Sequence, residues 1–520
     1  MKYYLIIFYN YIIQGSMEQY FFNLLFKLIS SVGIVFFILY CFFLSYYKYW
    51  EKRNFPYLVP RFPLGNSQSL FCKFPGPNLE FTDHYREIKK KGYKFAGVFA
   101  TIRPILVIAD TEIVKDILVK DFDHFADRGF YKTASDPLSV TLFSMDAVEW
   151  RKTRIRLTPT FTSGKLKMMF PLIICVSASM IEEIDDLAKE NSDIDIKKIA
   201  TNFTINTLAL CALGIEPGKS ESSYILSEMA QKHFDVHTPI DLLKYSLMNR
   251  FPDFSSILGL KLLKKEVSEF FITVVRDAMK YREEMKLFRP DLLELLMNIK
   301  NETKSSPNPL TDNQLIAEIF DFFLASLDTS SATISFTLFE LGKNPDIQEK
   351  VRLEIEGISN KHNGKLNTDS LAEMKYLHQI INESLRLYPP LPTLERKCMK
   401  SYKINGTDLI IEKGTSIVIP VFGIHRDPEH YPDPKKFDPE RFSDSNKGNI
   451  KANTYLPFGI GPRSCIGLRF GYLMVQIALI EILRRYRIAV SPSTCLPMDM
   501  DKQVLMLLLK NPILLKATKI

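Results

Sequence analysis

Cysteine pairs are missing from this sequence. It holds seven cysteines, an odd number, and no two of them form a Cys-x-x-Cys pair. The irregular spacing argues against a disulfide framework and against a zinc site, since both depend on paired cysteines. The seven are Cys41, Cys72, Cys175, Cys211, Cys398, Cys465 and Cys495. We therefore expect the bulk of the chain to lie in a reducing compartment.

Other recognisable signals are absent as well. The chain has no internal repeat and no low-complexity tract, and its net charge of +8 is too diffuse to indicate a nucleic-acid partner. It also lacks a glycine-rich phosphate loop and an Asp-Phe-Gly triplet, so His425-Arg426-Asp427 is not a kinase catalytic loop. Without a nucleotide site of its own, a redox enzyme built on this chain needs electrons from a separate protein.

One apolar run is long enough to cross a membrane. Residues 28–46 are apolar except for three serines and a glycine, which matches the ~20 residues of a spanning helix. No small-residue cleavage site follows, so we expect residues 17–50 to form an uncleaved anchor rather than a signal peptide. The chain after the anchor should be cytosolic, because basic residues follow it. These residues are Lys48, Lys52 and Arg53.

The rest of the chain divides into three parts. Residues 1–16 have two alternative interpretations, an interfacial membrane segment or an error in the assigned start site. Three prolines predict a stiff hinge over 51–66. Residues 67–520 should fold as one mainly α body with a minor β sheet. Patterns typical of strands occur at 95–100, 105–109, 402–404 and 409–411, and helical patterns at 113–119, 170–189 and 270–286.

The longest predicted helix starts at Thr311. A capping box begins it, and Gly342 and Pro345 mark its end, so roughly thirty residues at ~1.5 Å each could cross a whole domain. Its centre, 325–331, is rich in small and hydroxyl side chains and contains the charged Asp328. A surface helix with one polar stripe is the simpler interpretation, but the apolar residues on either side favour burial.

The most informative stretch is residues 458–467, Phe-Gly-Ile-Gly-Pro-Arg-Ser-Cys-Ile-Gly. Its glycines and proline allow a tight turn and close approach to a flat partner. Cys465 lies just ahead of an apolar helix predicted over 468–486, whose N-terminal N–H groups and dipole should favour a thiolate. A rigid thiolate beside Arg463 suits a soft metal or a haem iron. A lone cysteine is usually a small buried hydrophobe, so the argument depends on the whole decapeptide.

The decapeptide reads Phe-x-x-Gly-x-Arg-x-Cys-x-Gly and resembles the haem-binding loop of the cytochrome P-450 family at every fixed position. The resemblance implies haem b (iron protoporphyrin IX) as cofactor, with Cys465 as the axial ligand of its iron. It also implies that the haem is contacted by Phe458, Gly461 and Gly467 in the loop. The residues implied at the haem propionates are Arg463, Trp150, Arg154, Arg396 and, more weakly, Arg128.

Two further segments keep the order of the family's motifs. Residues 325–330 resemble the distal helix, which implies that Asp328 and Thr329 are catalytic and relay protons. Ser326 departs from the pattern, since glycine is usual there, and this affects the expected geometry of the oxygen pocket. The Glu-x-x-Arg core motif is similar as well, and it implies a structural role. Its members are Glu383, Arg386 and Arg441.

The resemblance runs from about residue 55 to the C-terminus and implies the cytochrome P-450 fold, with haem between the long distal helix and the cysteine-bearing proximal helix. It looks closest to insect microsomal members that act on xenobiotics and plant toxins, through segments 125–129 and 211–216. Such enzymes insert one atom of O2 into an apolar substrate, using NADPH-derived electrons from a flavoprotein reductase. Cytochrome b5 is a further implied partner. The implied location is the endoplasmic reticulum membrane, with the catalytic domain facing the cytosol.

Two surfaces and two alternatives complete the expectations. The pocket wall should include Phe322, Ala325, residues 391–394 and 513–514, and the loops after Asp127 and around Phe234. The reductase should bind a basic face, for which a merely solvated surface is an equal alternative. This face comprises Arg151, Lys152, Arg156 and Arg469.

One alternative function is a haem-thiolate isomerase or dehydratase, which needs no proton relay. The other is a membrane haem sensor or carrier without catalysis.

Overall fold

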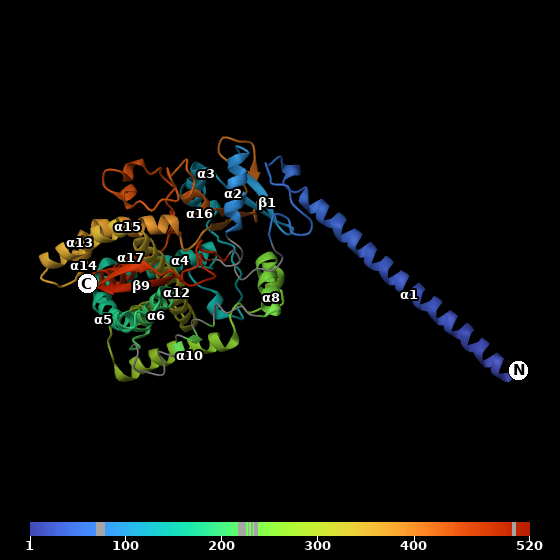
Figure 1. Cartoon of the computed structure of the whole chain (residues 1–520), viewed down its shortest axis with the longest axis horizontal. Helices are drawn as coiled ribbons and strands as arrows, with labels where there is room; N and C mark the ends of the chain where they lie inside the picture. The colour runs from blue at the N-terminus through green and yellow to red at the C-terminus, as the bar shows by residue number, and fades with distance from the viewer. Residues whose placement is uncertain (69–78, 217–224, 227, 230–231, 233–237, 502–505) are drawn as a thin grey trace.

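The computed structural model describes residues 1–68, 79–216, 225–226, 228–229, 232, 238–501 and 506–520. One long helix, α1 (Lys2–Tyr47), projects from a mainly helical body (Figure 1). Helices of the body are α2 (Glu80–Lys90), α3 (Thr111–Lys115), α4 (Ala147–Leu157), α5 (Ser163–Lys189), α6 (Ile196–Leu208), α8 (Pro239–Arg250), α9 (Pro252–Ile257), α10 (Lys265–Met285), α11 (Leu292–Glu302), α12 (Asp312–Lys343), α13 (Pro345–Lys361), α14 (Thr368–Glu373), α15 (Lys375–Leu387), α16 (Val421–His425) and α17 (Leu468–Leu483).

The strands form small sheets. Their bounds are β1 (Phe95–Ala100), β2 (Arg103–Ile108), β3 (Ile194–Asp195), β4 (Leu394–Lys397), β5 (Tyr402–Lys403), β6 (Ile410–Ile411), β7 (Ser416–Ile419), β8 (Tyr486–Val490) and β9 (Leu514–Lys519). The four-stranded sheet has the order β1-β2-β7-β4, in which β2 and β7 are parallel. A second sheet, β3-β9-β8, brings the C-terminal strand beside the end of α17.

Among the described residues, three helical segments are long and apolar enough to cross a membrane. Two of them, α5 and α12, are partly buried within the body, whereas the window within Phe21–Arg53 is not buried at all. This agrees with the predicted anchor. Residues from Lys2 onward continue into the same helix, and a separate status for residues 1–16 stays a prediction.

Trp50 joins the base of α1 to the first sheet. Its side chain is only 1% exposed and lies over Gly97 of β1, where an added Cβ would come within 2.3 Å of the indole ring. The indole N–H donates to the carbonyl oxygen of Val98 at 3.2 Å. The predicted hinge, 51–66, begins with a short 3-10 helix, Glu51–Arg53, and is not a free spacer, because its backbone makes hydrogen bonds of 2.9 and 2.8 Å with Gly97. β1 is an edge strand, and these bonds satisfy part of its open edge.

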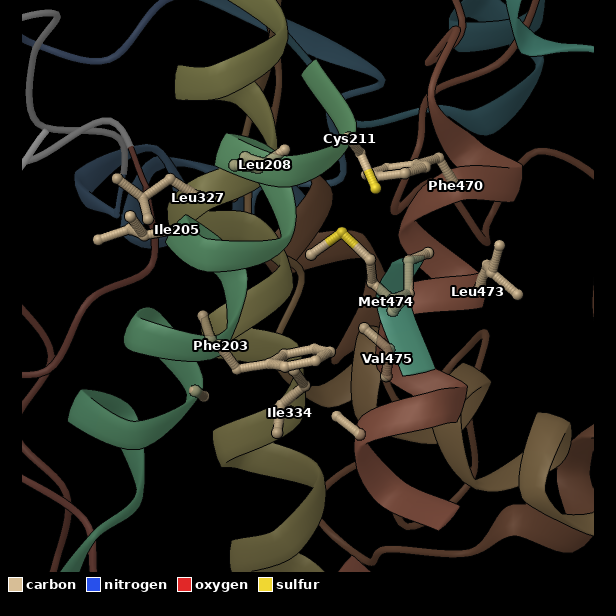
Figure 2. Close-up of a cluster of buried hydrophobic side chains, with 14 of the residues drawn as sticks. Phe203, Ile205, Leu208, Cys211, Leu327, Ile334, Phe470, Leu473, Met474 and Val475 are labelled. Atoms are coloured by element: carbon tan, nitrogen blue, oxygen red, sulfur yellow. The ribbon is translucent and has the colours of Figure 1, made fainter. Parts of the chain in front are cut away.

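The long helix α12 lies in the centre of the body. Thr311 caps it in the predicted capping box, which is confirmed. Figure 2 shows apolar side chains of α6, α12 and α17 gathered in one cluster, including Phe203, Ile334 and Met474. Contacts on both sides therefore hold the middle of α12 inside the protein, as the apolar density predicted.

Two helix predictions are wrong in their bounds. The helix predicted over 468–486 ends at Leu483, and Tyr486–Val490 forms β8 instead. Pairing of β8 with β9 fixes this boundary, and helical periodicity cannot reveal such a distant partner. The helix predicted over 113–119 is divided, because α3 ends at Lys115 and a π-helical turn, Asp116–Lys120, continues it.

Candidate active site

The loop before α17 places Cys465 at the edge of an enclosed space. Gly461 has a φ of +76°, and an added Cβ would stand 2.0 Å from the carbonyl oxygen of Leu118, so glycine is required there. The N–H of Cys465 closes the loop by donating to the carbonyl oxygen of Phe458 at 2.9 Å. The Cys465 side chain is exposed, yet desolvation raises the pKa of its thiol. Both observations hold if the thiol borders a space inside the protein.

That the helix N-terminus favours a thiolate at Cys465 stays a prediction. A backbone N–H of Gly467 and the charges of Arg154 and Arg128 lower the pKa of the thiol, but desolvation raises the pKa by more. The helix begins only at Leu468, and the surroundings of the sulfur are dry. A cation bound to the sulfur would reverse this balance, because a coordinated thiol loses its proton.

Four arginines gather near this thiol, and no ion pair within the described part of the chain includes them. They are Arg128, Arg154, Arg396 and Arg463. Desolvation lowers the pKa of Arg128 to about 10, of Arg396 to about 9 and of Arg463 to about 8. Repulsion between these guanidinium groups adds to the lowering for Arg396 and Arg463. Arg396 is 2% exposed, and its Nε has no hydrogen-bond partner among the described residues. Such a cluster fits a ligand with more than one negative charge.

The same arginines also fasten the loop to the rest of the body. Arg463 lies 4.3 Å above the ring centre of Trp150. Its guanidinium donates to the carbonyl oxygens of Ala126, Leu142 and Met145 at 2.9, 3.2 and 2.7 Å. Arg154 donates to the carbonyl oxygen of Ser464 at 2.9 Å. Arg463 therefore has a clear structural role, and contact with a propionate stays a prediction for it.

The polar centre of α12 satisfies its hydroxyl groups within the helix. Thr329 Oγ1 donates to the carbonyl oxygen of Ala325 at 2.7 Å, and Ser331 Oγ donates to that of Leu327 at 2.7 Å. These bonds to the preceding turn explain how hydroxyl side chains are tolerated in a buried helix. The Ala325 side chain is exposed even though most of this helix is buried. This face of α12 thus opens onto a space.

Asp328 turns toward α6, where it meets a lysine. Lys197 Nζ lies 2.8 Å from Asp328 Oδ1 and also donates to Ser331 Oγ at 2.6 Å. Both charged groups line a recess of about 390 Å³ between α6, α12 and segment 507–513. Asp328 thus lies beside an ion-pair partner and on the lining of a recess.

The family model of cytochrome P-450 matches residues 65–517. The chain belongs to the cytochrome P-450 family. It is 36% identical to cytochrome P-450 6a2 of Drosophila melanogaster over 486 residues, which cover 91% of this chain and 96% of that relative. It is 38% identical to probable cytochrome P-450 6a13 of the same species, over 92% and 95% of the two chains. Identity to cytochrome P-450 6k1 of Blattella germanica is 34%, over 89% and 91%.

Membership makes the chain a haem-dependent monooxygenase of the insect type predicted from the sequence. Its cofactor is haem, with O2 and electrons supplied through a redox partner. The residues fit this group. The exposed Cys465 thiol offers an iron ligand, and the arginine cluster offers positive charge for two carboxylates. The buried Nε of Arg396 has no hydrogen-bond acceptor within the described residues, so it can donate to a carboxylate of the cofactor.

The core motif of this cytochrome P-450 forms a buried cluster. The Arg386 guanidinium makes two bonds of 2.7 Å with the Glu383 carboxylate, and both side chains are fully buried. Arg441 Nε lies 3.4 Å from the same carboxylate. Arg386 also donates to the carbonyl oxygens of His425, Pro434 and Lys436. The structure therefore brings together the three residues of the predicted structural group.

The structure shows where some residues of the predicted pocket wall lie. Ala325 faces open space, and Ile513 lines the recess beside Asp328. Phe322 was expected in the wall, but its ring packs against Phe161 and Phe470 at centroid distances of 5.8 and 5.0 Å. A place for Phe322 in the pocket wall stays a prediction. The loop around Phe234 lies outside the described residues.

Sequence reasoning missed three charged residues near this site. Lys197 gave no signal, because a lysine near a helix N-terminus looks like a surface residue. Glu318 and Asp321 could have been noticed, since each is a carboxylate inside the apolar first half of α12. Of the acidic residues in that helix, only Asp328 has a predicted role in the reaction.

Proposed function

We propose that this chain is a membrane-anchored monooxygenase that oxidises apolar small molecules of the xenobiotic or plant-toxin class. The observation that carries the proposal is the position of Cys465, whose exposed thiol lies near four arginines that form no ion pair within the described residues. Haem, when bound there, supplies an iron that activates dioxygen. The chain's own residues hold the cofactor, exclude bulk water and deliver protons.

Each predicted site residue has a proposed role. Cys465 ligates the iron, and the glycines of its loop let the backbone lie close to the cofactor. The four arginines and Trp150 hold the propionates, because guanidinium groups pair with two oxygens at once. Phe458 packs beside the sulfur. The loop residues with this close-approach role are Gly461 and Gly467.

Proton delivery is proposed for Asp328 and Thr329. The Thr329 hydroxyl lies on the open face of α12 and can exchange its bond to Ala325 for a bond to a ligand oxygen. Asp328 borders the recess and can take protons from water there. Lys197 forms an ion pair with this carboxylate, and the pair would have to open for Asp328 to pass a proton on.

The electron donor is proposed to be an NADPH-dependent flavoprotein reductase, with cytochrome b5 as a second donor. The basic face formed by Arg151, Lys152, Arg156 and Arg469 lies on α4 and α17, beside the cysteine loop. Arg151 is partly neutralised by Asp123 at 2.7 Å, whereas Arg469 donates to the neutral hydroxyl of Ser163. Arg469 is therefore the better candidate for contact with an acidic partner. The basic residues after α1 support a cytosolic orientation on the endoplasmic reticulum membrane.

The first test replaces Cys465 with serine in the full chain. The reduced carbon monoxide complex of the parent should show the red-shifted Soret band of a thiolate ligand, and Cys465→Ser should lose it. Cys211→Ser, at a fully buried cysteine of the apolar core, is the matched control and should keep the band. Retention of the band in Cys465→Ser would remove the central assignment.

The second test separates a monooxygenase from the two alternatives. Thr329→Ala and Asp328→Asn should keep haem but lower the ratio of product to NADPH consumed, with more hydrogen peroxide, because protonation becomes inefficient. A general acid contributes roughly 100-fold or more to a rate, so we expect at least a ~10-fold fall for one variant. Ser335→Ala is the control, since its buried hydroxyl donates to the carbonyl oxygen of Ser331 further along α12. Turnover without NADPH would favour an isomerase or dehydratase, and no turnover with reductase would favour a carrier.

A further inference from the structure

Ser331 of α12 differs from neighbouring hydroxyl side chains of the same helix. Like Thr333 and Ser335, it is buried and donates to a backbone carbonyl one turn earlier, at 2.6–2.7 Å. Such a bond is how a buried helix tolerates a hydroxyl group. Of these three oxygens, only that of Ser331 is also reached by a charged side chain within the described residues. Lys197 Nζ lies 2.6 Å from it.

The chemistry of the two groups fixes the direction of each hydrogen bond. A serine hydroxyl has one proton, and that of Ser331 goes to the carbonyl oxygen of Leu327. An ammonium group has donors only, so Lys197 donates to a lone pair of Ser331 Oγ. A second ammonium proton goes to Asp328 Oδ1 at 2.8 Å. Lys197 is therefore held on α12 at two points.

The backbone of Lys197 is fixed at the start of α6. Asp195 caps this helix, since its carboxylate accepts from the N–H of Lys198 at 3.1 Å. Asp195 also pairs with Leu514 of the C-terminal strand β9. α6 itself packs along α12 in the core (Figure 2). The side chain of Lys197 can therefore reorient while its backbone stays beside α12.

The two contacts of Lys197 differ in their access to water. Ser331 is fully buried, whereas the side chain of Asp328 is 12% exposed and lines the recess. The side chain of Lys197 is 31% exposed. Water in the recess can hydrate the carboxylate and the ammonium group, but it does not reach the hydroxyl. The contact with Asp328 is thus the one that can open, and the contact with Ser331 is the one that can persist.

We infer that Ser331 is a positioning residue, which holds the ammonium group of Lys197 on α12 when Asp328 turns away to pass on a proton. This inference rests on the proposed function, in which the ion pair has to open. With the hydroxyl in place, the lysine stays where it is and the carboxylate returns to the same partner after each turnover. Without the hydroxyl, the ammonium group turns into the recess, and Asp328 loses the fixed position from which it delivers the next proton.

The first measurement tests the contact and needs no turnover. Lys197 of the full-length holoenzyme is acetylated with an amine-selective reagent, and the rate is followed by mass spectrometry. Ser331→Ala should raise this rate at least ~3-fold, because a hydrogen bond to a charged group is lost. Lys198, an exposed lysine on the same recess, is the internal reference and should react at one rate in every variant. Ser335→Ala removes an equivalent hydroxyl one turn further along α12 and should leave the rate at Lys197 unchanged.

Asp328→Ala imitates the opened ion pair. In this variant Lys197 should still react at least ~3-fold more slowly than in the double variant with Ser331→Ala, because the buried hydroxyl alone retains the ammonium group. Equal rates in these two variants would overturn the inference. So would an unchanged rate at Lys197 in Ser331→Ala.

The second measurement is the ratio of product to NADPH consumed. Ser331→Ala should lower this ratio ~3-fold or more in the parent and not at all in a Lys197→Met background, because the hydroxyl acts through the lysine. An equal fall in both backgrounds would show a merely structural role, and no fall in the parent would show that the contact does not serve proton delivery. Either result overturns the inference. An unchanged ratio in Asp328→Asn would overturn the proposed relay and with it the role of Ser331, whereas the acetylation rates report on the contact alone.

Discussion

At the residue scale, His425 is fixed in its neutral form by the backbone. Its Nε2 accepts from the N–H of Leu456 at 2.8 Å, so the ring proton must sit on Nδ1, which donates to the carbonyl oxygen of Arg386 at 3.1 Å. The side chain is fully buried. Desolvation, followed by the charge of Arg386, lowers the pKa of His425 to about 3. Protonation would cost one of these bonds and place a charge beside an arginine.

This arrangement predicts a loss of stability in mild acid. Below pH ~6.5 the unfolded chain binds a proton at this histidine that the folded chain does not bind, so the free energy of unfolding falls as the pH decreases. The loss should reach about 1.4 kcal/mol at pH 5.5 and continue until the folded value is reached. We expect His425→Gln to lose this part of the dependence. Urea unfolding at pH 7.5 and 5.5 measures it.

His362→Gln is the control for that measurement, because His362 is only partly buried and faces Glu373 at the surface. An equal fall between the two pH values in the parent and in His425→Gln would show that other groups cause the acid sensitivity.

At the element scale, α15 is joined to the segment 425–436 through one side chain. Arg386 makes two bonds to Glu383 and three to backbone carbonyls, all without contact with water. Arg386→Leu would leave the carboxylate and the carbonyl oxygens unpaired. Removing one partner of a buried pair typically costs about 3–5 kcal/mol, so haem retention should fail in this variant at moderate urea concentrations.

Lys375→Leu supplies the comparison on the same helix, since the exposed pair of Lys375 with Asp444 should contribute less than about 1 kcal/mol. Unfolding midpoints and haem content are measured together. Similar midpoints for both variants would mean that the buried cluster stabilises the body no more than a surface pair does.

The elements also show what the sequence could and could not predict. Local signals sufficed for the start of α12, because the capping box at Thr311 acts within one turn. The end of α17 failed, because the β8–β9 pairing joins residues that local periodicity does not connect. The contact of Phe322 with Phe470 could not be predicted for a related reason. Only the packing of α17 against α12 brings the two rings together.

The site shows the same division. The decapeptide around Cys465 identified the loop because its chemistry is contained in ten consecutive residues. The contact of Lys197 with Asp328 joins two helices, and nothing in the spacing of either residue indicates it.

At the scale of the whole molecule, the C-terminal end of the anchor packs against the folded body. Tyr47 is 7% exposed and packs on Phe99 at 5.2 Å, and Trp50 covers Gly97 of β1. Between residues 21 and 43 most side chains of this helix are exposed. We therefore expect the boundary of the independently folding body to lie inside the predicted anchor, 17–50, a few residues before its end.

Two truncations that differ by only six residues test this boundary. Removal of residues 1–44 should give a body that binds haem with the stability of the full chain and has weaker membrane affinity. Removal of residues 1–50 also deletes Trp50, whose loss uncovers Gly97 and the edge of β1. Loss of a buried tryptophan costs about 3–5 kcal/mol, so the shorter body should unfold at a clearly lower urea concentration. Trp50→Ala in the longer body should reproduce most of that shift. Equal midpoints for the two truncations would place the boundary after Trp50 and make the contact with β1 dispensable.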